Sequence, residues 1–350
     1  MQLKILLLLV VTLIFSAFRP KEEGGFDDGI SPQEDIQYTG DYPDFFEAKP
    51  LKVIALQGDN KLLVISEEPA KIIEFDLVSQ ALNELTVLPE KPTGAVLSRD
   101  SGKLFVTAGA QDGEVIEVDI EREKVIRRFS TSGHTPESPV LTADEQFLFV
   151  CNRFNNEVVK IGLKKGRVEK HFPVVREPRI LVISIEGRDL FAGNFLPAGP
   201  SDAERVNSSV SVIDLHQETV RHIELPNGSY AIRSMMLSPE GRFLYVTHVL
   251  GRHQVATTQI ERGWINTNAL SIIDAVKKEL ITTVLLDDHN LGFSNPSAIA
   301  CSPDGRSLCI ASFGGNELSL INRDRLHEKI ENAGSSAGLQ KSETNDFSTD

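Results

Sequence analysis

The sequence predicts an all-β fold, a β-propeller of four-stranded antiparallel blades, on three observations. A short turn rich in Gly, Asp and Ser recurs six times from about Leu51 onward. The turns begin at residues 57, 98, 142, 184, 238 and 302, which gives a base period near 42 residues with two longer spacings at the end. Each unit also holds up to four short runs of β-forming residues, and this combination is the signature of a propeller blade.

The first hairpin of each unit is defined by its turn and the apolar run that follows. Such turns supply the positive φ and the preset φ of Pro that a tight reversal requires. The turns are QGDNK (Gln57–Lys61), SRDSGK (Ser98–Lys103), TADEQ (Thr142–Gln146), SIEGR (Ser184–Arg188), SPEGR (Ser238–Arg242) and SPDGR (Ser302–Arg306). The second strands are expected at Leu62–Ser66, Leu104–Ala108, Leu148–Asn152, Leu190–Asn194, Leu244–His248 and Leu308–Ser312.

Two further runs complete most units. Alternating apolar and polar residues predict the third strands KIIEFDL, EVIEVDI, EVVKIGL, VSVIDL, LSIID and ELSLIN. Fourth strands are expected at ELTVL, VIRRF, VEKHF, VRHIEL and LITTVLL, so the sixth unit lacks one. About six repeats are therefore visible, and the ring is either six-bladed or an incomplete seven-bladed one.

The ends of the chain predict three further segments. Residues 1–18 carry one Lys and an apolar run of 14 residues, which is typical of a signal peptide or, alternatively, an N-terminal anchor. Residues 19–48 hold nine acidic residues without periodicity and are expected to be a disordered linker. The propeller then occupies residues 49–325, and residues 326–350 a short helix (RDRLHEKIE, beginning slightly earlier) with a polar, disordered tail. The protein is thus expected outside the cytoplasm, in the periplasm, at the cell surface or secreted.

The composition of the chain limits the classes of partner and cofactor that are expected. The formal net charge is −14, so a phosphate-binding surface, and with it nucleic acid, is not expected. No segment after the N-terminal one is apolar for 18 residues, so no further membrane span is expected. A C-x-x-C-H motif for covalent haem attachment does not occur in the sequence.

The three cysteines are expected to be mainly structural. Cys301 takes the core position of Leu97, and Cys309 takes that of Phe105. Because both lie in one hairpin, a cross-strand disulfide between them stays open. Cys151 is expected to be inert.

The repeats resemble a known family. SPEGRFLYVTH and SPDGRSLCIASFGGNELSLIN are similar to the YVTN repeat, and the resemblance covers roughly Leu51–Asp324. YVTN-like propellers commonly have seven blades and include surface-layer proteins, the propeller of haem-dependent nitrite reductases, and lactonase-like enzymes. THVLGRHQVATTQIERGWINTNALSIID is similar to exported bacterial propellers that precede a c-type cytochrome or peroxidase-like region, although this chain lacks a haem-attachment motif.

The insertions predict where a site lies. Phe195–Ser209 in repeat four and His248–Asn268 in repeat five both follow a second strand, and Leu286–Pro296 opens on the same face. Insertions confined to one face of a repeat array often mark the binding face. The residues expected on this face are His248, Arg252, His253, Arg262, Trp264, Asn266, Asp287, Asp288, His289 and Asn295. Smaller contributions are expected from Asn152, Arg153, Arg179, Asn194, Tyr230 and Arg233.

Three functions of this face stay open. Arg and Trp side chains favour docking of a protein partner or of a downstream redox domain, which would make the chain a scaffold in electron transfer and not an enzyme by itself. His248, His253 and His289 are candidate ligands of a metal or haem, the alternative being a haem- or metal-dependent oxidoreductase or a lactonase-like hydrolase. The polar groups could also serve only to hold the loops by hydrogen bonds. No cofactor is assigned to this chain.

Overall fold

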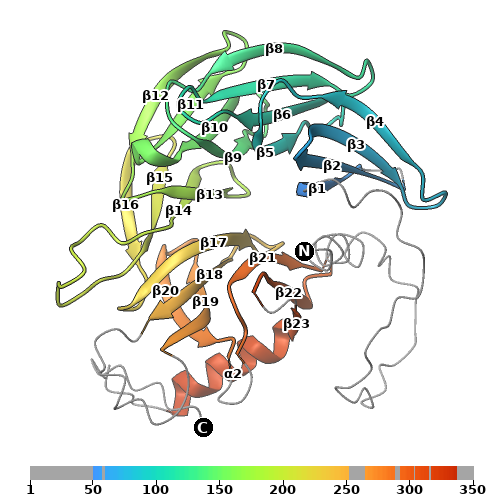
Figure 1. Cartoon of the computed structure of the whole chain (residues 1–350). Helices are drawn as coiled ribbons and strands as arrows, with labels where there is room; N and C mark the ends of the chain where they lie inside the picture. Colours follow the sequence, from blue (N-terminus) through green and yellow to red (C-terminus); the bar gives the residue numbers. More distant parts are fainter. Residues whose placement is uncertain are drawn as a thin grey trace.

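The predicted β-propeller is confirmed by the computed structural model, which describes residues 50–56, 60–251, 265–287, 292–302, 304–314 and 317–336. Six antiparallel sheets follow one another in chain order around a ring (Figure 1). Within the described residues five sheets have four strands and the sixth has three. The six blades match the six repeats counted in the sequence.

The strands of the first three blades lie at the predicted positions to within one or two residues. Blade one contains β1 (Pro50–Ala55), β2 (Lys61–Glu67), β3 (Ala70–Asp76) and β4 (Leu82–Val87). Blade two contains β5 (Pro92–Leu97), β6 (Lys103–Ala108), β7 (Glu114–Asp119) and β8 (Lys124–Ser130). Blade three contains β9 (Pro136–Leu141), β10 (Phe147–Asn152), the 3-10 turn η2 (Arg153–Asn155), β11 (Glu157–Gly162) and β12 (Arg167–Pro173).

The last three blades differ more from the repeat pattern. Blade four contains β13 (Pro178–Ile183), β14 (Asp189–Asn194), β15 (Ser209–Asp214) and β16 (Thr219–Glu224). Blade five contains β17 (Ser229–Leu237), β18 (Phe243–Gly251), β19 (Asn266–Asp274) and β20 (Glu279–Leu285). Blade six contains β21 (Pro296–Cys301), β22 (Ser307–Ser312) and β23 (Glu317–Asn322), and α2 (Arg323–Ser336) follows directly.

The recurring turns are held by their own side chains. In blade two the Ser98 hydroxyl donates to Asp100 (2.6 Å) and accepts from the Lys103 amide (2.9 Å). Blade six repeats the arrangement with Ser302 and Asp304. These serine–aspartate pairs close the first hairpin locally, which explains why the motif recurs where the blades need a tight reversal.

The innermost strands share an irregularity at their first residues. In five blades this strand starts with Pro, and in four of these its pairing with the second strand shifts by one residue immediately afterwards, at Leu51, Thr93, Arg179 and Ser297. Within a sheet, Pro is confined to edge strands, to the first residue of a strand and to bulges, because it has no amide hydrogen to donate. A bulge re-aims side chains at the end of a strand. In these four blades the bulge therefore sets the direction of the side chains at the start of the inner strand.

The hydrophobic core lies between successive blades. Blades four and five, for example, share a cluster that contains Phe191, Val212, Ile232 and Leu244. Separate clusters join blades one and two, two and three, three and four, and five and six. Each blade is therefore stabilised chiefly by its neighbours, as expected for a repeat architecture.

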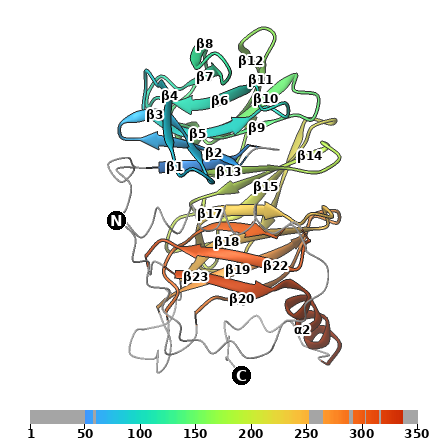
Figure 2. The same cartoon turned by 90° about the vertical axis from the view of Figure 1, so that its right-hand side faces the viewer.

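The C-terminal helix α2 packs on the last two blades. Leu326 and Ile330 of α2 join the apolar cluster of blades five and six. The Arg323 Nε donates to the Tyr245 hydroxyl (2.7 Å), which lies 2.7 Å from His327 Nε2. Figure 2 shows α2 beside these blades. No helix in the described part of the chain is long and apolar enough to cross a membrane.

The cysteines are all free thiols. Cys301 pairs with Leu308 while Cys309 pairs with Ala300, so the two cysteines are one register step apart. Adjacent strand residues point to opposite faces of a sheet, which excludes the disulfide that the sequence left open. Cys151 is fully buried, and desolvation raises the pKa of its thiol well above the usual value, in agreement with an inert role.

Candidate functional site

One face of the propeller carries the longer connections. In blade four, β14 and β15 are joined by residues 195–208, whereas β13 and β14 are joined at the other end by the short turn at 184–188. The pairing of Pro178 with Asn194 and of Ile183 with Leu190 fixes these two ends. We call the end with residues 195–208 the loop face. The inner strands start on this face, so their bulged residues lie there too.

His248 differs from the prediction. It belongs to β18, which runs for nine residues to Gly251 and pairs throughout with β19. Its side chain is completely buried. Nδ1 donates to the Val249 carbonyl (3.1 Å), and Nε2 lies 2.7 Å from the Ser271 hydroxyl. The sequence predicts His248 at the end of a second strand and on the binding face. The structure instead buries it inside the strand, because blade five extends its central strands, and it is therefore not part of the exposed surface.

Desolvation explains the charge state of this histidine. Burial lowers the pKa of His248 to about 4. A carbonyl oxygen only accepts hydrogen bonds, so the proton is on Nδ1 and Nε2 accepts from Ser271. Both ring nitrogens are thus used inside the blade.

Asp287 and Asn295 belong to a hydrogen-bonded connection between blades five and six. The Asp287 carboxylate accepts from the amides of Asn268 and Phe293. The Asn268 side chain in turn accepts from the Asn295 amide (3.0 Å). Asn266 is exposed at the start of β19. Asp287 and Asn268 are buried, so this part of the predicted face serves to fix the loop.

Six predicted face residues, namely Arg252, His253, Arg262, Trp264, Asp288 and His289, lie outside the described residues. Their common surface stays a prediction. So does a metal or haem site that includes His253 or His289. Within the residues that the structure describes, no group of three or more His, Cys, Asp or Glu side chains is arranged to hold a metal ion.

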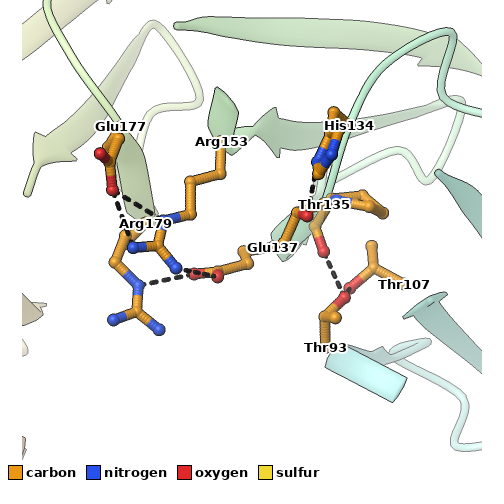
Figure 3. Close-up of polar contacts among 9 residues, drawn as sticks. Thr93, Thr107, His134, Thr135, Glu137, Arg153, Glu177 and Arg179 are labelled. Atoms are coloured by element: carbon orange, nitrogen blue, oxygen red, sulfur yellow. Dashed lines mark hydrogen bonds and ion pairs between the residues drawn. The ribbon is translucent and has the colours of Figure 1, made fainter. Parts of the chain in front are cut away.

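Three of the residues predicted to make smaller contributions to the binding face lie close together in the structure. Arg153 follows β10 and donates through Nη2 to Glu177 (2.8 Å) and through Nη1 to Glu137 (3.4 Å). Arg179, at the bulge of β13, donates through Nε to the other oxygen of Glu137 (2.8 Å). Figure 3 shows the chain of alternating charges that results. These side chains are between 11% and 30% exposed, so their ion pairs are only partly screened by water.

A phenylalanine lies at the centre of the same group. The guanidinium carbons of Arg153, Arg179 and Arg233 lie 5.4, 5.1 and 5.2 Å from the ring centroid of Phe195. These distances are within the range of cation–π attraction. We call these three arginines, Phe195, Glu137 and Glu177 the arginine cluster. It joins blades three, four and five at the loop face.

Arg233 is the member with unusual electrostatics. Its Nε is buried and has no hydrogen-bond partner among the described residues. Desolvation, followed by repulsion from Arg179 and Arg153, lowers the pKa of Arg233. Tyr230, on the same strand, has a raised pKa because it is half-buried. The cluster is therefore able to attract an anion.

Other predicted residues at this end have structural contacts. Asn152 and Asn194 are fully buried at the ends of β10 and β14. Asn152 donates to the Thr131 carbonyl (3.0 Å), and Asn194 donates to the Ser209 carbonyl (2.8 Å). Both asparagines thus tie the second strand of a blade to its neighbours.

Sequence reasoning missed Glu137, Glu177 and Phe195. A repeat signal exists for Phe195, because it occupies the same position in blade four as Arg153 does in blade three. The Phe195 amide donates to the Glu177 carbonyl, and the Arg153 amide donates to the Thr135 carbonyl. Both carbonyls belong to the residue directly before an inner-strand Pro. Superimposing the repeats at these prolines would have placed both residues beside the start of the inner strands.

Comparison with known proteins gives local similarity in sequence and broad similarity in fold. No family model matches the chain, so the YVTN resemblance stays a prediction. The chain is 27% identical over 164 residues to hydrazine synthase subunit beta from Kuenenia stuttgartiensis, covering 46% of this chain and 41% of that protein. It is 25% identical over 182 residues to antigen Lp49 from Leptospira interrogans, covering 47% and 37%. The chain thus spans less than half the length of these curated relatives.

A solved structure agrees with the architecture. The structure of Kuenenia stuttgartiensis hydrazine synthase matches with a TM-score of 0.73 over 85% of this chain and 83% of that chain, at 21% sequence identity. At this identity the match supports the propeller fold alone. One relative is by its name a subunit, that is, part of a larger assembly.

Proposed function

We propose that this chain is an exported, non-catalytic β-propeller subunit that docks a protein partner through its loop face. The partner we propose is a c-type cytochrome-like protein or a domain continuous with this chain. The observation that carries the proposal is the similarity to the subunit beta of hydrazine synthase, a protein that is named as part of an assembly. The cytochrome and the export rest on the motif resemblance at residues 247–274 and on the N-terminal apolar run.

The asymmetry of the faces supports docking at this end. Residues 195–208 extend on the loop face, while the opposite face of blade four carries the two short turns at 184–188 and 215–218. The arginine cluster adds partly buried charge near the inner strands. Arginine and aromatic residues are enriched among the residues that dominate protein interfaces.

Co-purification from the native host tests this function. The tagged full chain is isolated from the cell envelope, and its complex is separated by size exclusion with the Soret absorbance of haem followed. We expect a haem protein to co-elute with the wild type and with Arg188→Glu, which changes an exposed residue on the opposite face. Arg179→Glu should lower the co-eluting haem at least tenfold, because it reverses a charge in the arginine cluster.

Two outcomes would contradict the proposal. If the chain elutes alone and without haem, there is no cytochrome-like partner. If the two variants retain the partner equally, the loop face is not the docking face. A Soret band that stays with the isolated chain after the partner is removed would favour the haem-dependent alternative.

The intact mass of the purified chain tests export, since removal of the signal peptide shortens the chain by about 18 residues.

A further inference from the structure

The charges of the arginine cluster are not balanced. Glu137 and Glu177 neutralise two of its three guanidinium groups through the contacts of Arg153 and Arg179. Arg233 has no ion-pair partner among the described residues, although Phe195 holds it beside the other two arginines. The cluster therefore carries one excess positive charge.

Arg233 also leaves a donor unused. An arginine has five N–H donors, stays protonated in proteins and presents them in a rigid fork. The Nε of Arg233 is buried without an acceptor. A buried donor that is not hydrogen-bonded destabilises the folded state, and a buried like-charge contact adds to that cost. An anion at the terminal nitrogens of Arg233 would balance the charges that repel one another in the cluster.

Arg179 offers further donors to the same anion. Its Nε is occupied by Glu137, whereas its two terminal nitrogens point away from that carboxylate (Figure 3). Those nitrogens have no acceptor among the described residues. Arg179 and Arg233 lie on successive inner strands, β13 and β17, and contact the same ring. An oxyanion between these strands can thus accept from both guanidinium groups.

The charge balance selects the type of anion. One excess positive charge matches a singly charged group, and the two nearby glutamates would repel a doubly charged phosphate. Carboxylates also match the guanidinium fork geometrically. A carboxylate is therefore favoured over phosphate.

We propose that Arg233, together with Arg179, forms a carboxylate-binding site at the loop face of blades four and five. The site goes beyond the proposed function, because a carboxylate can bind it in the isolated chain. The carboxylate can come from a free organic acid or from an acidic residue of the docked partner.

Thermal unfolding of the full chain with acetate tests the site directly. We expect acetate to raise the midpoint of wild-type unfolding in a saturable manner, with a dissociation constant on the order of millimolar. Acetamide, which lacks the charge, should have no such effect at equal ionic strength. Phosphate should stabilise less than acetate at equal concentration. Arg221→Met, at an exposed arginine of β16, should respond as the wild type does.

Arg233→Met provides the decisive comparison. It should lose the response to acetate and, without acetate, unfold at or above the wild-type temperature, because a repelling charge has been removed. Arg233→Lys, which keeps the charge but lacks the fork, should bind acetate at least tenfold more weakly. An equal acetate response in wild type and Arg233→Met would overturn the proposal. So would a lower midpoint of Arg233→Met without acetate, since Arg233 would then be a structural residue.

Adding acetate to the complex of the chain with its partner shows where the carboxylate comes from. If excess acetate releases the partner from the wild-type complex, an acidic group of the partner occupies the site. If acetate binds and the partner stays bound, the site belongs to a free organic acid. These outcomes differ from a failure of the proposed function, in which no partner is recovered but the isolated chain still binds acetate.

Discussion

At the scale of single residues, burial decides the chemistry of His248. Its imidazole is fully buried in β18, and Ser271 links it to the Thr283 hydroxyl on β20 through two contacts of 2.7 Å. A protonated ring would lose its acceptor nitrogen and carry a charge without water. His248 is therefore a neutral, structural residue that joins three strands of blade five.

This burial makes the stability of the fold dependent on pH. The folded-state pKa of about 4 is lower than the unfolded value of 6.5, so the unfolded chain binds the proton first as the pH falls. Neutral His248 makes its full contribution to the free energy of unfolding above pH 6.5. This contribution is lost as the pH falls from 6.5 to the folded-state pKa. We expect a loss of about 3 kcal/mol over this range.

Denaturant unfolding of the wild type and His248→Gln at pH 7.5, 5.5 and 4.5 checks this effect. The glutamine variant does not titrate, so the wild type should lose stability relative to the variant at each lower pH. A difference that stays constant from pH 7.5 to 4.5 would contradict the burial argument.

The repeat pattern explains which features of the fold and of the candidate site could be predicted from the sequence. The positions of the blade strands and of α2 follow from the recurring turns and alternation. The environment of His248 does not, because nothing in the sequence after His248 indicates that β18 continues to Gly251 and pairs with β19 there, which buries the ring. The arginine cluster depends on contacts among three blades, so only Arg153, Arg179 and Arg233 were named, without Glu137 and Phe195.

At the scale of elements, α2 stabilises blade five and the three-stranded sheet of blade six. Its apolar residues, Leu326 and Ile330, pack in the cluster that contains Tyr245. Arg323 holds the start of the helix through the Tyr245 hydroxyl and the Gly305 carbonyl (2.9 Å). Burial raises the pKa of Tyr245 to about 12, so its hydroxyl stays protonated beside His327 Nε2.

Leu326→Ala tests this packing. Removing the partly buried side chain should lower the free energy of unfolding by about 1–3 kcal/mol. Lys329→Ala, at an exposed position of the same helix, should change it by less than about 0.5 kcal/mol. Chemical denaturation measures both, and equal effects would mean that α2 does not stabilise the blades.

At the scale of the whole molecule, successive blades approach so closely that some positions admit only glycine. A Cβ atom at Gly193 would lie 2.7 Å from a methyl of Ile180 and 2.7 Å from a methyl of Ile232. Ile180 belongs to blade four and Ile232 to blade five. The small residue thus sets the distance between the two blades that carry Arg179 and Arg233.

Gly193→Ala is therefore expected to destabilise the propeller by about 1–3 kcal/mol through overpacking. Gly199→Ala provides the control, since no atom lies within 4 Å of an added Cβ in the exposed connection of the same blade. Thermal unfolding should separate the two variants. A neutral Gly193→Ala would show that the blades can move apart without loss of stability.

Docking of a partner at the loop face is tested most directly by site-specific photo-crosslinking in the native host. A photo-reactive residue is placed at Asp202 on the loop face or at Glu186 in the turn at the other end of blade four, both exposed acidic positions. We expect a crosslink to a c-type cytochrome-like protein or domain from position 202 and none from position 186. A crosslink to that partner from position 186 alone, or from neither position while a complex is present, would contradict it.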